Sequence, residues 1–170
     1  YSNVFHADGG SASFSVMANT LRGVYGTDVL LATANSFTGS VLQADYNKKM
    51  AASMIMPNGL MSRQRTMTGA ELKETVRAFV EGCEGGFVPF NRGSLPVVSG
   101  IAVEVKEAGG SYTLTGITRN GQPLRDDDTV TVTCLAAENQ MEALLASESS
   151  TSLDGDTWVK NRWRDHLSRA

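Results

Sequence analysis

The segment from residue 60 to residue 83 restricts the fold most, because a strand pattern passes directly into a helix pattern. Residues 60–67 have the spacing of a strand. Thr68 and Glu71 then form a T-x-x-E capping box, which satisfies free backbone amides at the start of a helix. The predicted helix runs from Gly69 to Cys83, and its apolar stripe is formed by Leu72, Val76, Phe79 and Val80. The sequence therefore favours a fold that mixes strands and helices.

Similar patterns predict further elements along the chain. Helices are predicted over 11–25, 45–54, 138–146 and 156–169, and Phe14, Met17, Leu21 and Val24 share one face of the first. Strands are predicted over 28–33, 97–106, 111–119 and 129–135, with Asn120-Gly121 as a type I′ hairpin turn. The helices and strands interleave irregularly, which predicts an α+β fold with a mixed sheet and packed helices.

The length and composition fit one folded domain. The chain has 170 residues, of which 41% are hydrophobic, so it can bury a single core and is too apolar for a disordered chain. We expect one domain over 1–170, with a core at about 10–146, a polar linker over 147–155 and a C-terminal helix over 156–169. Because the sequence begins with Tyr1 rather than methionine, we expect a fragment or a processed product.

Charge and hydropathy argue against two kinds of interaction. Lys and Arg number 15 against 18 Asp and Glu, a net charge of −3, whereas a nucleic-acid-binding surface needs an excess of basic residues. No apolar run approaches the roughly 18 residues that cross a bilayer. We therefore expect no nucleic-acid partner and no membrane-spanning segment.

Histidine and cysteine are too few and too scattered to indicate a metal centre. His6 and His166 stand near opposite ends of the chain, and Cys83 and Cys134 form no C-x-x-C pair. We expect no metal and no cofactor in this chain. Two interpretations of the cysteines stay open, buried thiols or a disulfide between them, and no neighbouring histidine supports a catalytic thiol.

Two charged segments are interpreted as surface. Arg63 and Arg65 share one face of a predicted strand, where we expect exposed, solubilising charges. The aspartates 126–128 are expected to form a solvated acidic turn, since the alternative, a Ca²⁺ site, lacks the glycine and the distal glutamate of an EF-hand loop. No Ser-His-Asp, Cys-His or paired-carboxylate arrangement indicates a free-standing enzyme.

Several segments follow one another in a recognisable order and spacing. They are Ser13–Val24 with Asp28–Leu31, Met56-Pro57 with Met61–Val76, Ser99–Val105, Ile117–Leu124 and Thr129–Ala137. Together, over about residues 10–146, they resemble the C-terminal domain of the 5′-nucleotidase family. The resemblance implies an upstream metallophosphoesterase domain that binds divalent metals and hydrolyses phosphoric esters, while this domain supplies the substrate pocket. This chain alone would be inactive, because metal-activated water needs ligands that it lacks.

The pocket residues of that family are replaced at the matching positions. The family holds a nucleobase between two aromatic rings, with an asparagine and arginines around the nucleoside. Here Thr38 stands at the place of an arginine, Asn58 at that of the first ring and Glu142 at that of the second. Thr33 takes the place of the asparagine unless the register shifts to Asn35. We therefore expect that ordinary 5′-nucleotides do not bind in the manner of the family.

The same loops remain the candidate ligand pocket. The candidate residues, implied by the resemblance, are Asn35, Phe37, Thr38, Asn58, Asn139 and Glu142, and the ligand expected there is a small polar molecule. Phe87, Phe90 and Arg92 could form a replacement aromatic platform, although packing beneath their own loop is the simpler interpretation.

The resemblance implies a substrate-binding domain of a nucleotidase-like hydrolase with a role in nucleotide catabolism. The alternative is a degenerate member of the family that serves as a cell-surface binding or structural module. Because members of the family are commonly exported or surface-attached, the resemblance also implies an extracellular, cell-surface or periplasmic location.

Overall fold

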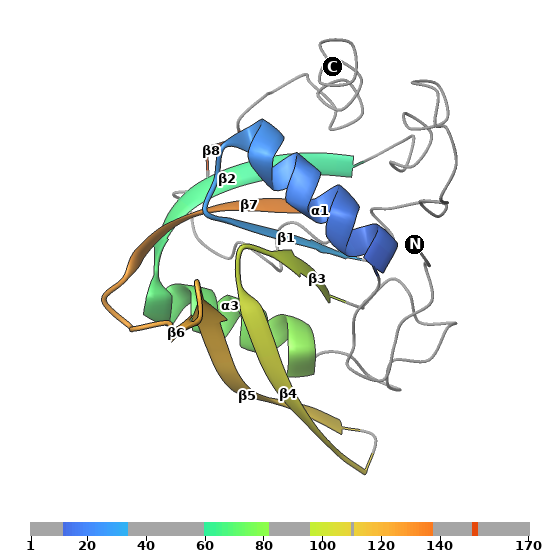
Figure 1. Ribbon diagram of the computed structural model, residues 1–170, viewed down its shortest axis with the longest axis vertical. Coiled ribbons are helices and arrows are strands. Elements are labelled where there is room, and N and C mark those ends of the chain that lie inside the picture. Colours follow the sequence, from blue (N-terminus) through green and yellow to red (C-terminus); the bar gives the residue numbers. More distant parts are fainter. Residues whose placement is uncertain (1–11, 34–59, 82–95, 110, 138–150, 153–170) are drawn as a thin grey trace.

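The computed structural model describes residues 12–33, 60–81, 96–109, 111–137 and 151–152 (Figure 1). The elements are α1 (Ala12–Tyr25), β1 (Val29–Thr33), β2 (Leu60–Thr68), α3 (Gly69–Glu81), β3 (Pro96–Ser99), β4 (Ala102–Ala108), β5 (Ser111–Arg119), β6 (Gln122–Pro123), β7 (Thr129–Ala137) and β8 (Thr151–Ser152). The helices predicted over 45–54, 138–146 and 156–169 lie outside the described residues. Strand β8 falls within the segment that was expected to be a linker.

The strands form two sheets. The larger sheet has the order β3-β1-β7-β2-β8, and the smaller one has the order β4-β5-β6. In the larger sheet β1 and β7 are parallel, whereas β3, β2 and β8 each pair antiparallel with their neighbours. The predicted α+β fold with a mixed sheet is thus confirmed.

Helices cover the larger sheet on both faces. Helix α1 packs against β1 and β3 on one face, and α3 contacts β2 and the strand β5 of the smaller sheet (Figure 1). Helix α3 therefore lies between the two sheets. Neither described helix is long and apolar enough to cross a membrane.

Helix α1 follows the predicted pattern and ends where a glycine allows it. Phe14, Met17 and Leu21 are buried as expected, whereas Val24 is only half-buried. Gly26 has a φ of +64°, and the amide of Thr27 donates to the carbonyl oxygen of Arg22 at 3.3 Å. The amide of Gly26 also donates to the carbonyl oxygen of Gly23 at 3.2 Å, which completes a Schellman motif.

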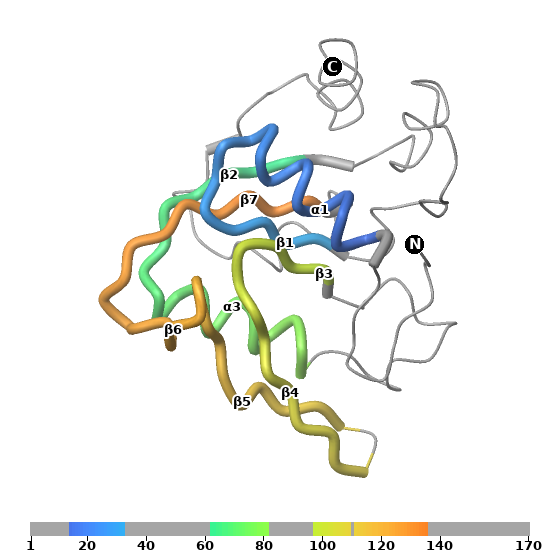
Figure 2. The backbone as a smooth tube through the Cα atoms, viewed as in Figure 1, coloured from blue at the N-terminus to red at the C-terminus, as the bar shows by residue number. Residues whose placement is uncertain are grey.

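The chain leaves the larger sheet at Gly100. The β-rich stretch predicted over 97–106 is two strands, because the chain passes from β3 in one sheet to β4 in the other (Figure 2). Gly100 has a φ of +88°, and a Cβ atom built on it would lie 2.0 Å from the carbonyl oxygen of Asp28. Only glycine fits both requirements without displacing the backbone of Asp28.

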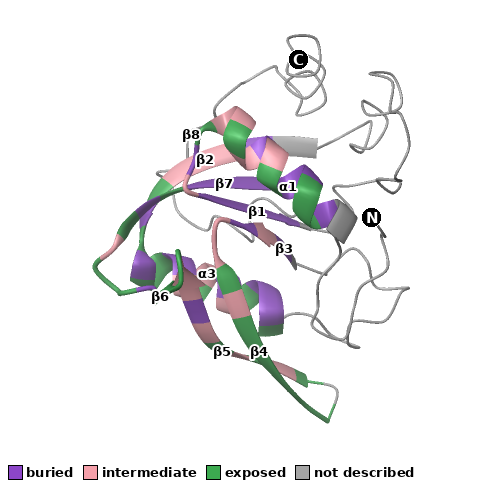
Figure 3. Cartoon of the chain, viewed as in Figure 1, coloured by how far each residue is buried: buried purple, intermediate pink, exposed green. Residues whose placement is uncertain are grey.

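The main apolar core lies around α3, between the two sheets. Figure 3 shows the buried residues concentrated in β1, β7 and the inner side of α3. The fully buried or nearly buried members of this core are Val29, Leu31, Met67, Leu72, Val76, Phe79, Val80, Ile117, Leu124, Val130, Val132 and Cys134. The predicted apolar stripe of α3 is therefore confirmed.

The capping box at the start of α3 is formed as predicted. The Glu71 amide donates to Oγ1 of Thr68 at 3.2 Å, and the Thr68 amide donates to Oε2 of Glu71 at 2.8 Å. Both side chains thereby satisfy backbone groups that the first helical turn leaves free.

Loss of this cap has a moderate expected cost. Thr68→Ala should lower the free energy of unfolding by about 1 kcal/mol, because the amide of Glu71 loses its acceptor. Urea denaturation followed by circular dichroism measures the change. Thr68→Ser keeps the hydroxyl and should lose far less, so equal losses in the two variants would contradict a capping role.

Candidate functional site

Four strand ends of the larger sheet lie at one edge. Thr33 pairs with Pro96, which places the end of β1 beside the start of β3. Leu60 pairs with Ala137, so the end of β7 lies beside the start of β2. Because β1 and β7 are parallel, with Ala32 beside Leu135, these four ends belong to the same edge. The start of α1 lies at the same side (Figure 1).

The candidate pocket residues follow or precede these ends in the sequence. Asn35, Phe37 and Thr38 come within five residues after β1; Asn58 comes two residues before β2; Asn139 and Glu142 come two and five residues after β7. All six lie outside the described residues, as do His6, Cys83, Phe87, Phe90, Arg92 and His166. The topology thus brings together the strand ends that lead to three candidate segments.

The described residues beneath this edge are apolar or small. Ala32, Val97 and Leu135 are buried, and Ser62 is 5% exposed. The buried ends of these strands carry no charged side chain within the described part of the chain. Polar contacts to a ligand at this edge would therefore have to come from the loops rather than from the strands.

A small cavity lies on the α3 side of β1 and β3. It has a volume of about 10 Å³, no more than a single water molecule needs, and is lined by Leu31, Ala32, Val76, Phe79, Val97 and Val98. All of these side chains are apolar, so the cavity offers no group that would orient a polar ligand.

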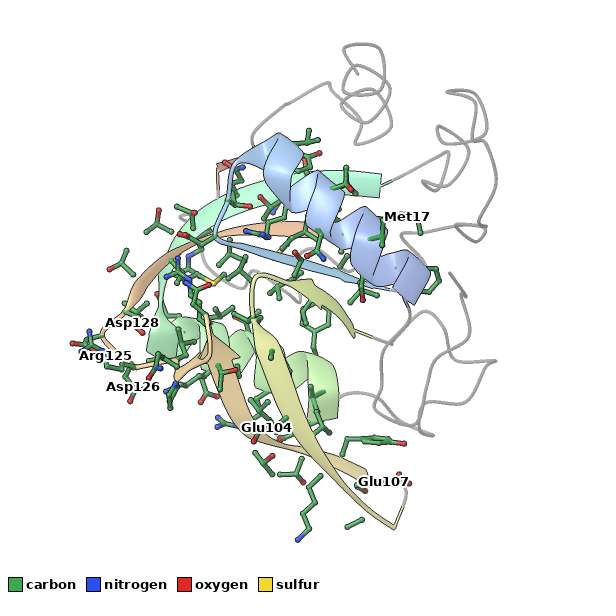
Figure 4. All side chains as sticks on the ribbon, in the orientation of Figure 1. Met17, Glu104, Glu107, Arg125, Asp126 and Asp128 are labelled. Atoms are coloured by element: carbon green, nitrogen blue, oxygen red, sulfur yellow. The ribbon has the colours of Figure 1, made fainter. Side chains whose placement is uncertain are left out.

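The acidic turn between β6 and β7 supports the start of α3 (Figure 4). Asp126 and Asp127 have side chains that are 76% and 80% exposed, as expected of a solvated turn. Lys73 pairs with Asp126 at 2.7 Å, and the Arg125 amide donates to Oδ2 of Asp128 at 2.9 Å. This hydrogen bond from the Arg125 amide is the main reason why the pKa of Asp128 lies below its ordinary value.

These carboxylates are engaged by cations and amides. Among the described residues, no three His, Cys, Asp or Glu side chains are grouped as they would be around a metal ion. The carbonyl oxygens of Asp126 and Asp128 accept from the amides of Ala70 and Gly69, at 3.1 and 2.7 Å. The turn is thus part of the cap of α3.

A second polar cluster joins three strands at the opposite edge of the sheet. Asp28 accepts hydrogen bonds from the amide of Thr131 at 2.8 Å and from its hydroxyl at 2.9 Å, and it pairs with Arg119. The amide of Thr131 contributes most to holding the pKa of Asp28 below 3.8, followed by its hydroxyl and by Arg119 and Arg22, while burial opposes the shift. Asp28 therefore ties β1 to β5 and β7.

This cluster should make the protein sensitive to acid. Because the pKa of Asp28 is lowered on folding, the unfolded chain binds more protons as the pH falls below about 4, and stability decreases there. Asp28→Asn should be less stable at pH 7 and should lose less stability between pH 5 and pH 3. Urea denaturation at each pH measures this slope. The exposed Asp127→Asn variant is the control and should retain the parent slope.

Cys134 is a free and fully buried thiol. Burial raises its pKa to about 12, although the nearby Arg65 acts in the opposite direction. A thiol in this state is neither exposed nor ionised at neutral pH, so it is unsuited to nucleophilic catalysis. Of the two open interpretations, the buried thiol is correct for Cys134, while Cys83 lies outside the described residues.

Cys134 should react with a thiol reagent only when the protein unfolds. In a Cys83→Ser background, labelling by a disulfide reagent at pH 8 should be slower than that of unfolded protein by roughly the unfolding equilibrium constant, about 10³-fold or more. The reaction is followed by absorbance with and without denaturant. Rapid labelling of the folded variant would contradict the burial of this residue.

The fold recurs in solved structures, whereas no protein-family model and no curated protein sequence matches the chain. A putative 5′-nucleotidase from Staphylococcus aureus superposes with a TM-score of 0.68 at 14% identity, over 98% of this chain and 36% of that one. A 5′-nucleotidase precursor from Thermus thermophilus has a TM-score of 0.64 at 15% identity, over 90% of this chain and 32% of that one. The sulfate thiohydrolase SoxB of the same organism has a TM-score of 0.60 at 12% identity, over 92% of this chain and 28% of that one.

This chain thus spans about a third of the length of the solved proteins that it matches. The identities are low, so the likeness concerns the course of the backbone rather than the pocket side chains. The chain has the fold of a domain that makes up about a third of these 5′-nucleotidase structures, and the predicted resemblance is confirmed at the level of the fold.

Proposed function

We propose that this chain is the ligand-binding domain of a 5′-nucleotidase-like phosphoesterase and that it is inactive by itself. The observation that carries the proposal is the fold, which matches about a third of each 5′-nucleotidase structure over nearly all of this chain. We infer that this third of the protein binds the ligand, while the remaining two thirds would carry the catalytic residues and metals.

The proposed pocket lies at the edge where β1 and β7 end and β2 begins. Its side chains come from the segments that carry Asn35, Phe37 and Thr38, then Asn58, then Asn139 and Glu142. The register of the sheet supports this pocket, since it brings the adjoining strand ends to one edge. The apolar ends of the strands support it too, because they leave polar recognition to the loops.

The proposed ligand is a small polar molecule rather than an ordinary 5′-nucleotide. A base stacked on an aromatic ring gains about 1–3 kcal/mol, and Asn58 and Glu142 supply neither ring. Thr38 supplies no guanidinium fork for planar recognition, and Glu142 would repel a phosphate. The likeness to SoxB, named as a sulfate thiohydrolase, supports a fold that is compatible with other ligands.

The catalytic metals would belong to an upstream phosphoesterase domain in the parent protein. The whole chain offers two histidines, far apart in sequence, whereas a two-metal hydrolase draws its ligands from several. The expected location of the parent is outside the cytoplasm, as the resemblance implies. Reading the gene upstream of Tyr1 tests the upstream domain: Asp, His and Asn metal motifs support the hydrolase, and their absence would favour the binding or structural module instead.

An activity assay on this chain tests the proposal that it is inactive by itself. With Mg²⁺, Mn²⁺ or Zn²⁺ and AMP or p-nitrophenyl phosphate, the isolated chain should release no phosphate above the buffer rate. Turnover that survives repurification would overturn the proposal that the chain is inactive by itself.

Restoring the rings tests the position of the pocket. The variant Thr38→Arg, Asn58→Phe, Glu142→Phe should gain AMP binding, because two stacked rings and a guanidinium supply several kcal/mol. The control places the same three residue types on the exposed positions Thr66, Lys106 and Glu107, which lie on β2 and β4. Equal affinities in the two variants would contradict a pocket at this edge.

A further inference from the structure

Arg63 and Arg65 lie side by side on the α3 face of the larger sheet. Alternate residues of a strand point to the same face, and these two belong to the row that continues to the buried Met67. In the register with β7 they stand opposite Cys134 and Val132, which are also core residues. Gln64, between them, points to the other face, where its amide donates to the carbonyl oxygen of Tyr25 in α1 at 3.1 Å.

These arginines are not the exposed charges that their sequence pattern suggested. The side chain of Arg65 is only 15% exposed, and Arg63 is half-buried. Their stems lie along the apolar row of β7, where the aliphatic part of an arginine covers apolar surface. Two positive charges are thus partly withdrawn from water at neighbouring positions.

Arg65 has a fixed partner. Its Nη2 atom lies 2.7 Å from Oε1 of Glu71, while the other oxygen of Glu71 accepts from the amide and the hydroxyl of Thr68. The Thr68 amide contributes most to lowering the pKa of Glu71, so this carboxylate stays ionised at neutral pH. The capping box therefore holds the guanidinium of Arg65 in place.

Arg63 has no counter-charge in the described part of the chain. No described carboxylate lies within 4 Å of its guanidinium, and the one carboxylate beside Arg65 is already engaged. The Nε atoms of both arginines are buried without an acceptor. Burying a donor without an acceptor costs free energy, and a guanidinium cannot avoid that cost by losing its proton.

The other half-buried arginines of the described residues are compensated. Arg119 pairs with Asp28, and Arg77 pairs with Glu74 and Glu81. Arg22 donates from Nε to the hydroxyl of Ser99 at 2.9 Å, and its charge also acts on Asp28. Arg63 thus differs from the other half-buried arginines, each of which has a partner in the described part of the chain. An external anion would supply the partner that Arg63 lacks there.

We propose that Arg63, together with Arg65, binds an inorganic-phosphate-like oxyanion on this face of the sheet. Residues two apart on a strand are about 6.7 Å apart, so their guanidinium forks can reach different oxygens of one tetrahedral dianion. Glu71 balances one of the two positive charges, so the remaining charge of Arg63 is the one that an anion would neutralise. The proposal goes beyond the ligand pocket, since it involves two strand residues and none of the candidate loop residues.

Titration of inorganic phosphate into this chain tests the proposal. Isothermal calorimetry at pH 7.5 and low ionic strength, with chloride as the reference salt, should give a 1:1 complex with a dissociation constant of about 1 mM or tighter. Arg63→Gln should weaken binding roughly tenfold or more, and Arg63→Lys should lose less, because it keeps the charge but not the fork. Lys106→Gln removes one exposed charge from β4 and should bind within about twofold of the parent.

Each outcome decides for or against the site. Thermal melts identify any variant that fails to fold, and in that case Arg63→Lys carries the comparison with Lys106→Gln. Absence of binding by the parent, equal affinity in Arg63→Gln, or an equal loss in Lys106→Gln would each overturn the proposal. The last outcome would mean that net charge alone governs the association.

Discussion

Gly69→Ala should lower the free energy of unfolding by about 3 kcal/mol, because α3 starts in direct contact with the chain before β7. A Cβ atom on Gly69 would lie 1.9 Å from the carbonyl oxygen of Arg125 and 3.0 Å from its carbonyl carbon. These are backbone atoms, so no rotamer change can relieve the clash. If α3 moved away from Arg125 to relieve the clash, the hydrogen bond from the Gly69 amide to the carbonyl oxygen of Asp128 would also break.

The melting temperature measures this effect. A loss of that size corresponds to a fall of roughly 6–12 °C for a domain of this length. Gly23→Ala is the matched control, since Gly23 lies in α1 and a Cβ built on it meets nothing within 4 Å beyond the adjacent helix backbone. That change should raise stability by about 0.5–1 kcal/mol. A Gly69→Ala variant that melts like Gly23→Ala would contradict the close approach at the start of α3.

Leu21→Ala should lower the free energy of unfolding by about 2–5 kcal/mol, through lost apolar burial and the cavity that remains. Leu21 is 0% exposed on α1, the helix that covers the face of the larger sheet opposite α3. Val16, on the same helix, is 37% exposed. Val16→Ala should therefore change stability by less than about 0.5 kcal/mol.

Urea denaturation separates these two variants. Similar losses at Leu21 and Val16, or no loss at either position, would show that α1 does not pack on the sheet as described.

Elements with strong local signals could be predicted from the sequence. The capping box of Thr68 and Glu71 specifies the start of α3 through its own hydrogen bonds, so no distant residue is needed to locate it. The same is true of the hairpin after β5, where Asn120 and Gly121 have φ values of 52° and 77°, as a type I′ turn requires.

The split between β3 and β4 could not be predicted by the same means. Val97, Ile101, Val103 and Val105 form an apolar pattern that fits one long strand. The break depends on the approach of Gly100 to the backbone of Asp28, which is far away in sequence. A periodicity within one window carries no information about that contact.

The environment of Arg63 and Arg65 was wrongly predicted for a related reason. Their alternation on the strand is correct, but burial depends on which face the core occupies. That face is set by β7, where the core residues Cys134 and Val132 stand opposite the two arginines. Strand spacing alone assigns two residues to a common face without saying what covers it.

For the candidate pocket, the backbone framework could be predicted but the side chains could not be checked. The resemblance predicted an α+β fold with a mixed sheet, and the observed fold agrees with that of the solved 5′-nucleotidase structures. The pocket side chains themselves rest on residue-by-residue comparison, and all six lie outside the described residues. Their proposed role therefore depends on binding experiments.

Calorimetric titration of AMP and adenosine into this chain tests the central proposal most directly. The proposal that the nucleotide-holding residues are replaced predicts no binding with a dissociation constant below about 1 mM, because the two stacking rings and the arginine are missing. A dissociation constant in the micromolar range for either compound would contradict it.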